Sequence, residues 1–282
     1  MENLPQMLQK IPGILSAEAI PAPEAYREAV QLCAICYLSD GCRVMGYAAC
    51  PAGTVHPLPC LIYNRGGNRE FGILRPEAVC RFAARGYLVL GSQYRGNCGG
   101  TGREEFGGAD VNDVLRLIDI GLQLPAAQPG GVYMVGHSRG GMMTCLACAR
   151  DDRIRAAVLG AGMTDCFMMY ETREQSMKDV FHELVGGGPD THAEAFAARS
   201  ATCQAHRIHT PMLLCQGTDD WRVVPEMSRK MYAKLQEAGC ECRLILYPGA
   251  DHSLKGTTFT DDAAAWLAAH PLPQTSAPAD SR

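Results

Sequence analysis

The fold is decided by the stretch Gly131-Val132-Tyr133-Met134-Val135-Gly136-His137-Ser138-Arg139-Gly140-Gly141. Its residues 132–135 form a short β-branched and aromatic run, which is typical of a buried central strand. A helical pattern begins immediately after the stretch. Between the two lies Gly136-x-Ser138-x-Gly140, the pattern of a nucleophile elbow. The sequence therefore predicts a strand, a sharp turn that carries Ser138, and a helix.

The glycines of this motif have a steric role. A strand-to-helix turn this sharp holds Ser138 in a strained backbone conformation and brings the flanking backbone close, so only residues without a Cβ fit beside it. The Ser138 hydroxyl would stand above the end of the strand, and the N–H of Arg139 would face an oxyanion formed there. The alternative is an ordinary glycine-rich turn, because the motif also occurs by chance. The strand before it and the helix after it favour the elbow.

Composition limits the classes of protein to which the chain can belong. Its 282 residues, 47% of them hydrophobic, suffice for one large α/β domain or two small ones with a sizeable core. The net charge of −4 and the lack of a Lys/Arg cluster argue against a nucleic-acid partner. No apolar run reaches the length of a membrane span, and residues 1–5 lack the pattern of a signal peptide. We therefore expect a cytoplasmic protein that binds neither nucleic acid nor membrane.

The 14 cysteines do not form a metal-binding pattern. Three pairs are closely spaced: Cys33 and Cys36, Cys145 and Cys148, and Cys240 and Cys242. The first pair falls in an expected strand, where residues three apart point to opposite faces. The second pair shares a helix face, where core packing is expected, and no histidine or second cysteine pair has zinc-ligand spacing to the third. The glycine-rich stretch 97–102 also lacks the ending of a phosphate-binding loop. We expect reduced, apolar core cysteines and neither a metal nor a cofactor.

The rest of the chain alternates between strand and helix patterns. Strands are expected within 29–50 (two, joined by a hairpin turn), 60–63, 87–90, 154–159, 211–216 and 242–247, and helices at 76–85, 111–122, 225–238 and 261–269. This alternation predicts an α/β fold with a mostly parallel central sheet covered by helices on both faces. We expect one domain over 29–270, preceded by an extension over 1–28 with a short surface helix and followed by a disordered tail over 271–282.

The regular alternation is interrupted over 161–210. This segment contains a methionine-rich run and an amphipathic piece. It is expected to form a short helical cap that shapes a substrate pocket, with Met168, Tyr170 and the later Trp221 as pocket residues. The alternative is a set of ordinary packing helices outside the sheet.

The residues that Ser138 would need follow later strands. A serine hydroxyl attacks an acyl carbon only when a histidine accepts its proton and a carboxylate orients that histidine. Asp219 and Asp220 follow the strand at 211–216, and His252 follows the last strand. The carboxyl ends of parallel strands lie at one edge of a sheet, so these side chains are expected near Ser138. Serine, acid and histidine in this order are typical of α/β-hydrolases.

These motifs resemble the catalytic domain of the prolyl oligopeptidase family of serine peptidases, within the α/β-hydrolase superfamily. Four stretches carry the resemblance: 94–96, 136–141, 217–225 and 247–252. The resemblance implies the α/β-hydrolase fold and a triad of Ser138, Asp220 and His252, because the family acid stands three residues after the glycine. Asp219 is the alternative acid, since a shift of one residue would exchange the two.

The oxyanion loop departs from the family pattern. Where relatives have Tyr or His before Gly-Gly, this chain has Arg65 before Gly66-Gly67. The second oxyanion donor, beside the Arg139 N–H, is then either the Arg65 guanidinium or a backbone N–H of its loop. In the latter case we expect the Arg65 side chain to pair with a surface carboxylate such as Glu70.

Three functions are compatible with these motifs. The first is a serine peptidase acting on short peptides or small amides, and the second is a carboxylesterase with the same triad. The third is a catalytically silent α/β-hydrolase scaffold that binds a small molecule, against which the intact triad argues. The sequence does not separate the first two, because both use one acyl-enzyme chemistry and differ only in the shape of the pocket.

Overall fold

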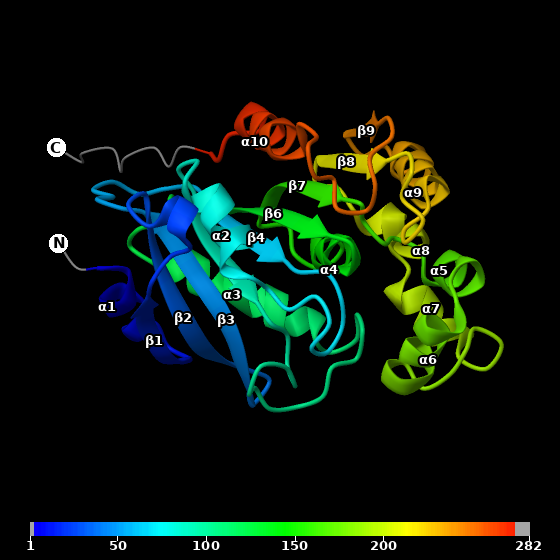
Figure 1. Ribbon diagram of the computed structural model, residues 1–282, viewed down its shortest axis with the longest axis horizontal. Coiled ribbons are helices and arrows are strands. Elements are labelled where there is room, and N and C mark those ends of the chain that lie inside the picture. The colour runs from blue at the N-terminus through cyan, green and yellow to red at the C-terminus, as the bar shows by residue number, and fades with distance from the viewer. Residues whose placement is uncertain (1–2, 274–282) are drawn as a thin grey trace, which may run out of the picture.

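The computed structural model describes residues 3–273, and within them a nine-stranded β-sheet runs through the molecule (Figure 1). Its strands lie in the order β1-β2-β3-β5-β4-β6-β7-β8-β9. They are β1 (Ile14–Ile20), β2 (Val30–Ser39), β3 (Cys42–Pro51), β4 (Cys60–Asn64), β5 (Leu88–Ser92), β6 (Val132–His137), β7 (Ile154–Gly160), β8 (Met212–Gly217) and β9 (Cys242–Tyr247). β5, β4 and β6 to β9 are parallel, whereas β1 to β3 are antiparallel to their neighbours. The expected mostly parallel sheet is confirmed.

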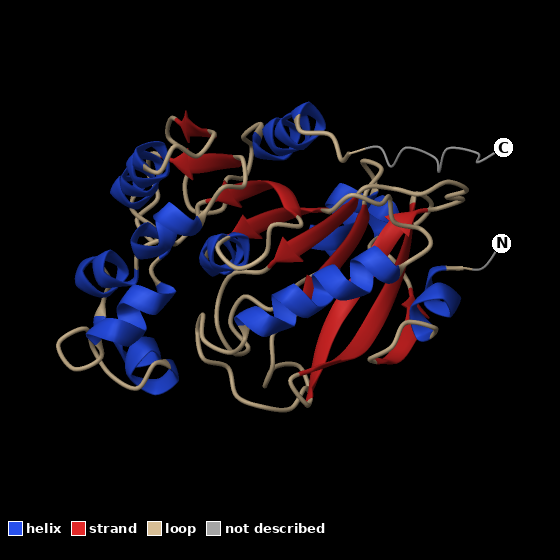
Figure 2. Ribbon diagram, turned by 180° about the vertical axis from the view of Figure 1, so that it is seen from behind, coloured by secondary structure: helices blue, strands red, loops and turns tan. Residues whose placement is uncertain are grey.

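Helices cover both faces of this sheet. α1 (Leu4–Gln9), α3 (Val111–Gln123), α4 (Arg139–Cys148) and α9 (Pro225–Glu237) pack on one face, and α2 (Pro76–Ala83) and α10 (Phe259–Ala269) pack on the other. Seen from behind, α3 lies across the strands (Figure 2). A hydrophobic core lies on each face of the sheet, and the strands contribute side chains to both because successive side chains point to opposite faces. Leu88 and Leu90, for example, belong to one core and Val89 to the other.

The N-terminal segment contains the expected short helix, α1, whose Leu4 and Leu8 are fully buried against the rest of the domain. It also contributes β1, which pairs antiparallel with β2 and forms the edge of the sheet. The sequence of β1 carries no clear alternation, so only the pairing with β2 identifies it as a strand.

The C-terminal segment was expected to be disordered from residue 271. Residues 274–282 of that segment lie outside the described residues. Leu272, by contrast, packs against the core on the α2 side of the sheet. The described start of the segment is therefore packed on the domain.

The segment between β7 and β8 forms a layer of short helices. These are α5 (Cys166–Thr172), α6 (Gln175–Leu184), α7 (Ala193–Arg199) and α8 (Ala201–Gln204). They gather at the end of the molecule opposite to β1 (Figure 1). Phe181 and Phe196 stack with ring centroids 4.9 Å apart, and Tyr170 contacts both rings edge-on. This segment, which we call the cap, therefore has its own aromatic core.

All 14 cysteines are free thiols, and most are buried. Burial raises the pKa of the Cys60 thiol to about 12. Among residues 3–273, no three His, Cys, Asp or Glu side chains come together in a way that could hold a metal ion. Within the same residues, no helix is both long and apolar enough to cross a membrane.

Candidate active site

The turn between β6 and α4 carries Ser138. This serine has a φ of 57°, in the left-handed region that costs energy for a residue with a side chain. A Cβ on Gly136 would collide with the carbonyl of Gly140, and a Cβ on Gly140 would collide with the carbonyl of Asn64. The steric role expected of the glycines is thus present in the structure. It explains why the turn can close so tightly around the serine.

Ser138 lies at one end of a chain of hydrogen bonds. Its hydroxyl lies 3.0 Å from Nε2 of His252, and Nδ1 of His252 lies 2.8 Å from Oδ2 of Asp220. Asp220 follows β8 and His252 follows β9, so three loops at the same edge of the sheet supply the three side chains. The structure therefore brings together the serine, acid and histidine expected from the sequence.

The Asp220 carboxylate is held by its own loop. Oδ1 accepts hydrogen bonds from the N–H groups of Arg222 and Val223, each at 2.9 Å, and Oδ2 accepts one from the Gln216 side chain at 3.0 Å. Burial raises the pKa of Asp220, but the bonds from His252 and these donors hold it below its usual value. The carboxylate is therefore ionised and fixed in orientation, and Gln216 is a supporting residue that the motif did not identify.

Asp219, the alternative acid, points elsewhere. It is exposed, and its carboxylate accepts a hydrogen bond from the Thr218 hydroxyl at 3.0 Å. Its backbone N–H donates to the carbonyl of Ala250 at 3.0 Å. Only Asp220 of the two contacts His252.

His137, the residue before the serine, contacts the loop that carries His252. Its Nε2 donates to the His252 carbonyl at 2.9 Å, and the two rings lie 5.1 Å apart. Burial, followed by the nearby His252 ring, lowers the pKa of His137 to about 4. His137 is therefore neutral at pH 7 and ties the end of β6 to the histidine loop. No signal in the sequence pointed to this role, because the residue between the glycine and the serine varies freely in the motif.

Two stretches of backbone face the Ser138 hydroxyl. Arg139 is the first residue of α4, so its N–H has no acceptor within the helix. On the other side, a Cβ on Gly66 would lie 2.9 Å from the Ser138 Cβ, which places the loop after β4 directly against the serine. Among residues 3–273, the N–H groups of Gly66 and Gly67 form no backbone hydrogen bond. The loop therefore offers free donors beside the serine.

The Arg65 side chain is not one of these donors, which corrects the guanidinium alternative. Arg65 is 2% exposed, and its five N–H bonds point to backbone carbonyls. These acceptors are the carbonyls of Gln93 (twice), Gly66, Gly72 and Arg69. It does not pair with Glu70 either. Its guanidinium holds the loop over 66–72 in place, because a fork of five donors can satisfy several carbonyls of one turn.

Replacing Arg65 with alanine should therefore act mainly on stability. The change leaves buried carbonyls without donors, and we expect the free energy of unfolding, measured in urea, to fall by about 3 kcal/mol. Arg75→Ala, at an exposed position of the same region, is the control and should cost less than about 0.5 kcal/mol. Unchanged stability together with a large loss of kcat at constant KM would restore the guanidinium as an oxyanion donor.

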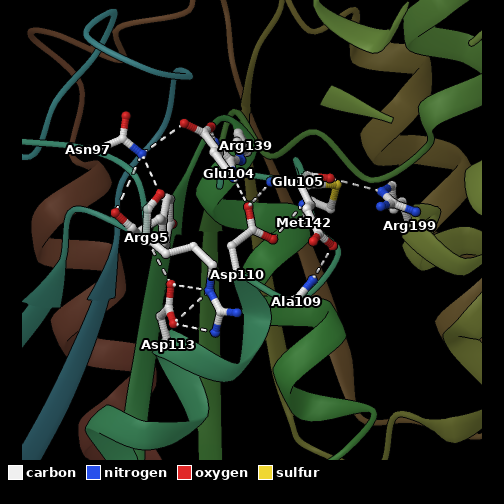
Figure 3. A network of polar contacts seen from close by, with 12 residues as sticks. Arg95, Asn97, Glu104, Glu105, Ala109, Asp110, Asp113, Arg139, Met142 and Arg199 are labelled. Carbon is white, nitrogen blue, oxygen red and sulfur yellow. Dashed lines mark hydrogen bonds and ion pairs between the residues drawn. The ribbon is translucent and has the colours of Figure 1, made fainter. Parts of the chain in front are cut away.

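The Arg139 side chain belongs to a buried polar network (Figure 3). Arg139 is 2% exposed and pairs with the carboxylates of Glu104 and Asp110, which are 4% and 0% exposed. Its guanidinium also lies between the rings of Tyr94 and Phe106, 4.7 Å from each centroid. The network fixes the start of α4, and with it the turn that carries the serine. The motif identified the backbone of Arg139 but not these acidic partners.

A cavity opens on each side of Ser138 and His252. The first, about 420 Å³, lies under the cap and we call it the cap lobe. Its apolar wall is formed by Met163, Met169, Met177, Val180, Val223 and Trp221. The second, about 350 Å³, lies beside α2 and we call it the α2 lobe. Ser138 and His252 therefore line both cavities.

The pocket residues expected from the cap are corrected in part. Trp221 lines the cap lobe and is 62% exposed at its mouth. Met168 and Tyr170 do not line it, whereas their neighbour Met169 does. Successive residues of a helix point about 100° apart, so only one face of α5 meets the cavity. The other face packs inside the cap, where Tyr170 contacts Phe181, and the sequence alone does not say which face is which.

Comparison with known proteins agrees with this geometry. The strand order, the elbow and the hydrogen-bonded serine, histidine and aspartate are those of a serine hydrolase with the α/β-hydrolase fold. A family model, that of the prolyl oligopeptidase family, matches residues 77–270. The chain belongs to this family.

Relatives of known sequence or structure span peptidases and esterases. An uncharacterized peptidase of Bacillus subtilis, YtmA, is 32% identical over 79% of this chain and 86% of its own. The human acylamino-acid-releasing enzyme is 26% identical over 76% of this chain, which spans only 31% of that enzyme. An acylaminoacyl peptidase of Pyrococcus horikoshii superimposes with a TM-score of 0.72 at 18% identity, over 98% of this chain and 45% of its own. An acetyl xylan esterase from Paenibacillus also gives 0.72 at 18% identity, over 94% and 92% of the two chains.

Proposed function

We propose that this chain is a serine peptidase that cleaves short peptides or small amides through an acyl-enzyme intermediate. The observation that carries the proposal is the chain of hydrogen bonds from Ser138 through His252 to Asp220. Membership of a serine peptidase family supports it, and so does the cavity on each side of the serine.

The proposed roles follow from the chemistry of acyl transfer. His252 accepts the proton of Ser138 as the hydroxyl attacks the acyl carbon, and Asp220 stabilises the imidazolium that forms. The N–H of Arg139 and a backbone N–H of the loop over 65–67 would bind the oxyanion. His252 then protonates the leaving group, and water releases the acyl group by the same steps in reverse. This scheme requires no cofactor or metal.

A carboxylesterase is the second candidate, because the same residues would cleave an ester. The acetyl xylan esterase fold matches 92% of that enzyme's chain, so the overall shape favours it as much as a peptidase. A silent binding scaffold is the third candidate, and the intact hydrogen-bonded triad speaks against it. A reducing, cytoplasmic location is part of the proposal and is supported by the 14 free thiols.

Active-site labelling tests the proposal first. A fluorophosphonate probe should label the wild type, and Ser138→Ala should abolish labelling because the nucleophile is gone. Ser253→Ala, an exposed serine beside His252, is the matched control and should label like the wild type. Labelling that persists in Ser138→Ala would exclude this serine, and an unlabelled wild type would favour the silent scaffold.

A substrate panel then separates the first two candidates. Turnover of aminoacyl amides is compared with turnover of p-nitrophenyl esters of matched acyl groups. A peptidase should cleave both series, since the residues that cleave the more stable amide bond also cleave an ester. Turnover of the esters alone would establish the carboxylesterase.

A further inference from the structure

The two lobes of the cavity differ in how their charges are paired. Four arginines line the cap lobe: Arg69, Arg139, Arg173 and Arg222. Three of them form ion pairs: Arg69 with Glu183 at 2.5 Å, Arg173 with Glu174 at 2.8 Å, and Arg139 with Glu104 and Asp110. Apart from Arg222, the cap lobe is thus an apolar space whose cations are already neutralised.

The α2 lobe also has four arginines, but none of them is paired. They are Arg65, Arg75, Arg81 and Arg222, and the only carboxylate in the lining is Glu77. Within residues 3–273, none of the four forms an ion pair with an acid. The lobe therefore carries a net positive charge next to the serine.

Two of the four arginines are wholly or partly buried and two are exposed. Arg65 is 2% exposed and donates only to carbonyls, which leaves its charge without a carboxylate in contact. Arg222 is half-buried beside the rings of Phe71 and Trp221, 5.9 and 5.3 Å from their centroids. Arg75 and Arg81 are exposed on the N-cap and last turn of α2. The field of Arg81 reaches His137, whose pKa is lowered first by burial, then by the His252 ring and least by this charge.

We propose that the α2 lobe binds the free C-terminal carboxylate of a short peptide, an inference that rests on the peptidase function proposed above. The C-terminal part of a peptide is the leaving group in acyl transfer to serine, so the α2 lobe takes the leaving group. The apolar cap lobe takes the acyl part. Guanidinium groups suit this task because they donate paired hydrogen bonds to a carboxylate. The enzyme then prefers peptides short enough for their carboxylate to reach the lobe.

Matched substrates test this assignment. An N-acetylated dipeptide with a free carboxylate is compared with the same dipeptide as its C-terminal amide. We expect the wild type to favour the acid over the amide by about tenfold or more in kcat/KM, mainly through KM, since a few partly exposed charge pairs supply that much. Raising the salt concentration should reduce the preference.

Variants connect the preference to the lobe. Arg75→Gln with Arg81→Gln should reduce the ratio of acid to amide several-fold, because only Arg222 and the carbonyl-bound Arg65 then remain in the lobe. Arg85→Gln is the control: Arg85 follows α2 closely, but it pairs with Asp261 at 2.9 Å and does not line the lobe. This control should keep the wild-type ratio. A wild type that does not distinguish acid from amide would overturn the proposal, as would a double variant that retains the preference.

Two further measurements complete the test. The first asks whether the positive charge serves the acyl part of the substrate instead of the leaving group, and the second measures binding without turnover. A C-terminal amide with glutamate on the acyl side probes whether the charge instead serves that side, and a preference for it would overturn the assignment. Calorimetric binding of the acid and the amide to Ser138→Ala needs no turnover. If the wild type cleaves nothing, the peptidase proposal fails, while tighter binding of the acid would still support the anion site and equal binding would refute it.

Discussion

Asp220→Asn should reduce kcat by about ten-thousandfold while leaving the fold intact, as the loss of this acid does in well-studied serine proteases. The neutral amide cannot stabilise the imidazolium of His252. The amide also favours the His252 tautomer that is protonated on Nε2. This atom lies 3.0 Å from the Ser138 hydroxyl and has to be unprotonated to accept the hydroxyl proton. The measurement is kcat on the best p-nitrophenyl ester or amide, with circular dichroism as a check on folding.

Asp219→Asn is the matched control for this change. It alters the neighbouring residue in the same way, but its carboxylate is exposed and does not contact His252. We expect it to keep most of the wild-type activity. If Asp219→Asn were the more damaging of the two, the orienting role would move to Asp219, and the hydrogen bond seen to Asp220 would not be the functional one.

Arg139→Met should be the most destabilising single change near the site. Methionine fills much of the space between Tyr94 and Phe106 but leaves Glu104 and Asp110 buried without their cation. Breaking a buried ion pair in this way typically costs about 3–5 kcal/mol. The measurement is urea unfolding at pH 7. Arg229→Met, which removes an exposed pair with Glu226, should cost less than about 1 kcal/mol.

The pH dependence of the free energy of unfolding identifies the cause of the stability loss in Arg139→Met. In the wild type, burial raises the pKa of Glu104, but Arg139 above all holds it below the usual value. Without Arg139, we expect burial to outweigh the remaining hydrogen bonds and to raise the pKa of Glu104 in the folded variant above that of the unfolded chain. The folded variant then binds the proton more tightly, so its deficit is largest at neutral pH and shrinks as the pH falls toward 5. A deficit that is constant with pH would indicate lost packing rather than an unpaired charge.

Much of the site was predictable because its chemistry is local in sequence. Ser138 sits in a turn that only flanking glycines allow, and His252 follows a strand that the residue pattern identifies. Parallel strands place their following loops at one edge, so the order of strands and motifs was enough to expect these residues side by side. The choice of Asp220 over Asp219 came from the register of a family motif, and the geometry agrees with it.

The tertiary structure decided everything that depends on which face of an element meets which neighbour. Arg65 could have pointed to the serine or to solvent, and only the packed loop shows its five donors turned to carbonyls. Met169 rather than Met168 lines the cavity because α5 is rotated by its packing in the cap. β1 becomes a strand only through its pairing with β2.

Charge pairing depends on the packed molecule in the same way. The sequence alone determined the fold class and was enough to predict Ser138 as the nucleophile, His252 as its partner and the loops that carry them, because glycine sterics and strand order act within short stretches of chain. It did not determine that Arg139 pairs with Glu104 and Asp110, whereas Arg75 and Arg81 form no ion pair among the described residues. A cation is neutralised only by a carboxylate that the fold brings within a few ångströms, and these partners lie tens of residues apart in the chain. Which lobe stays basic is therefore decided by the tertiary structure.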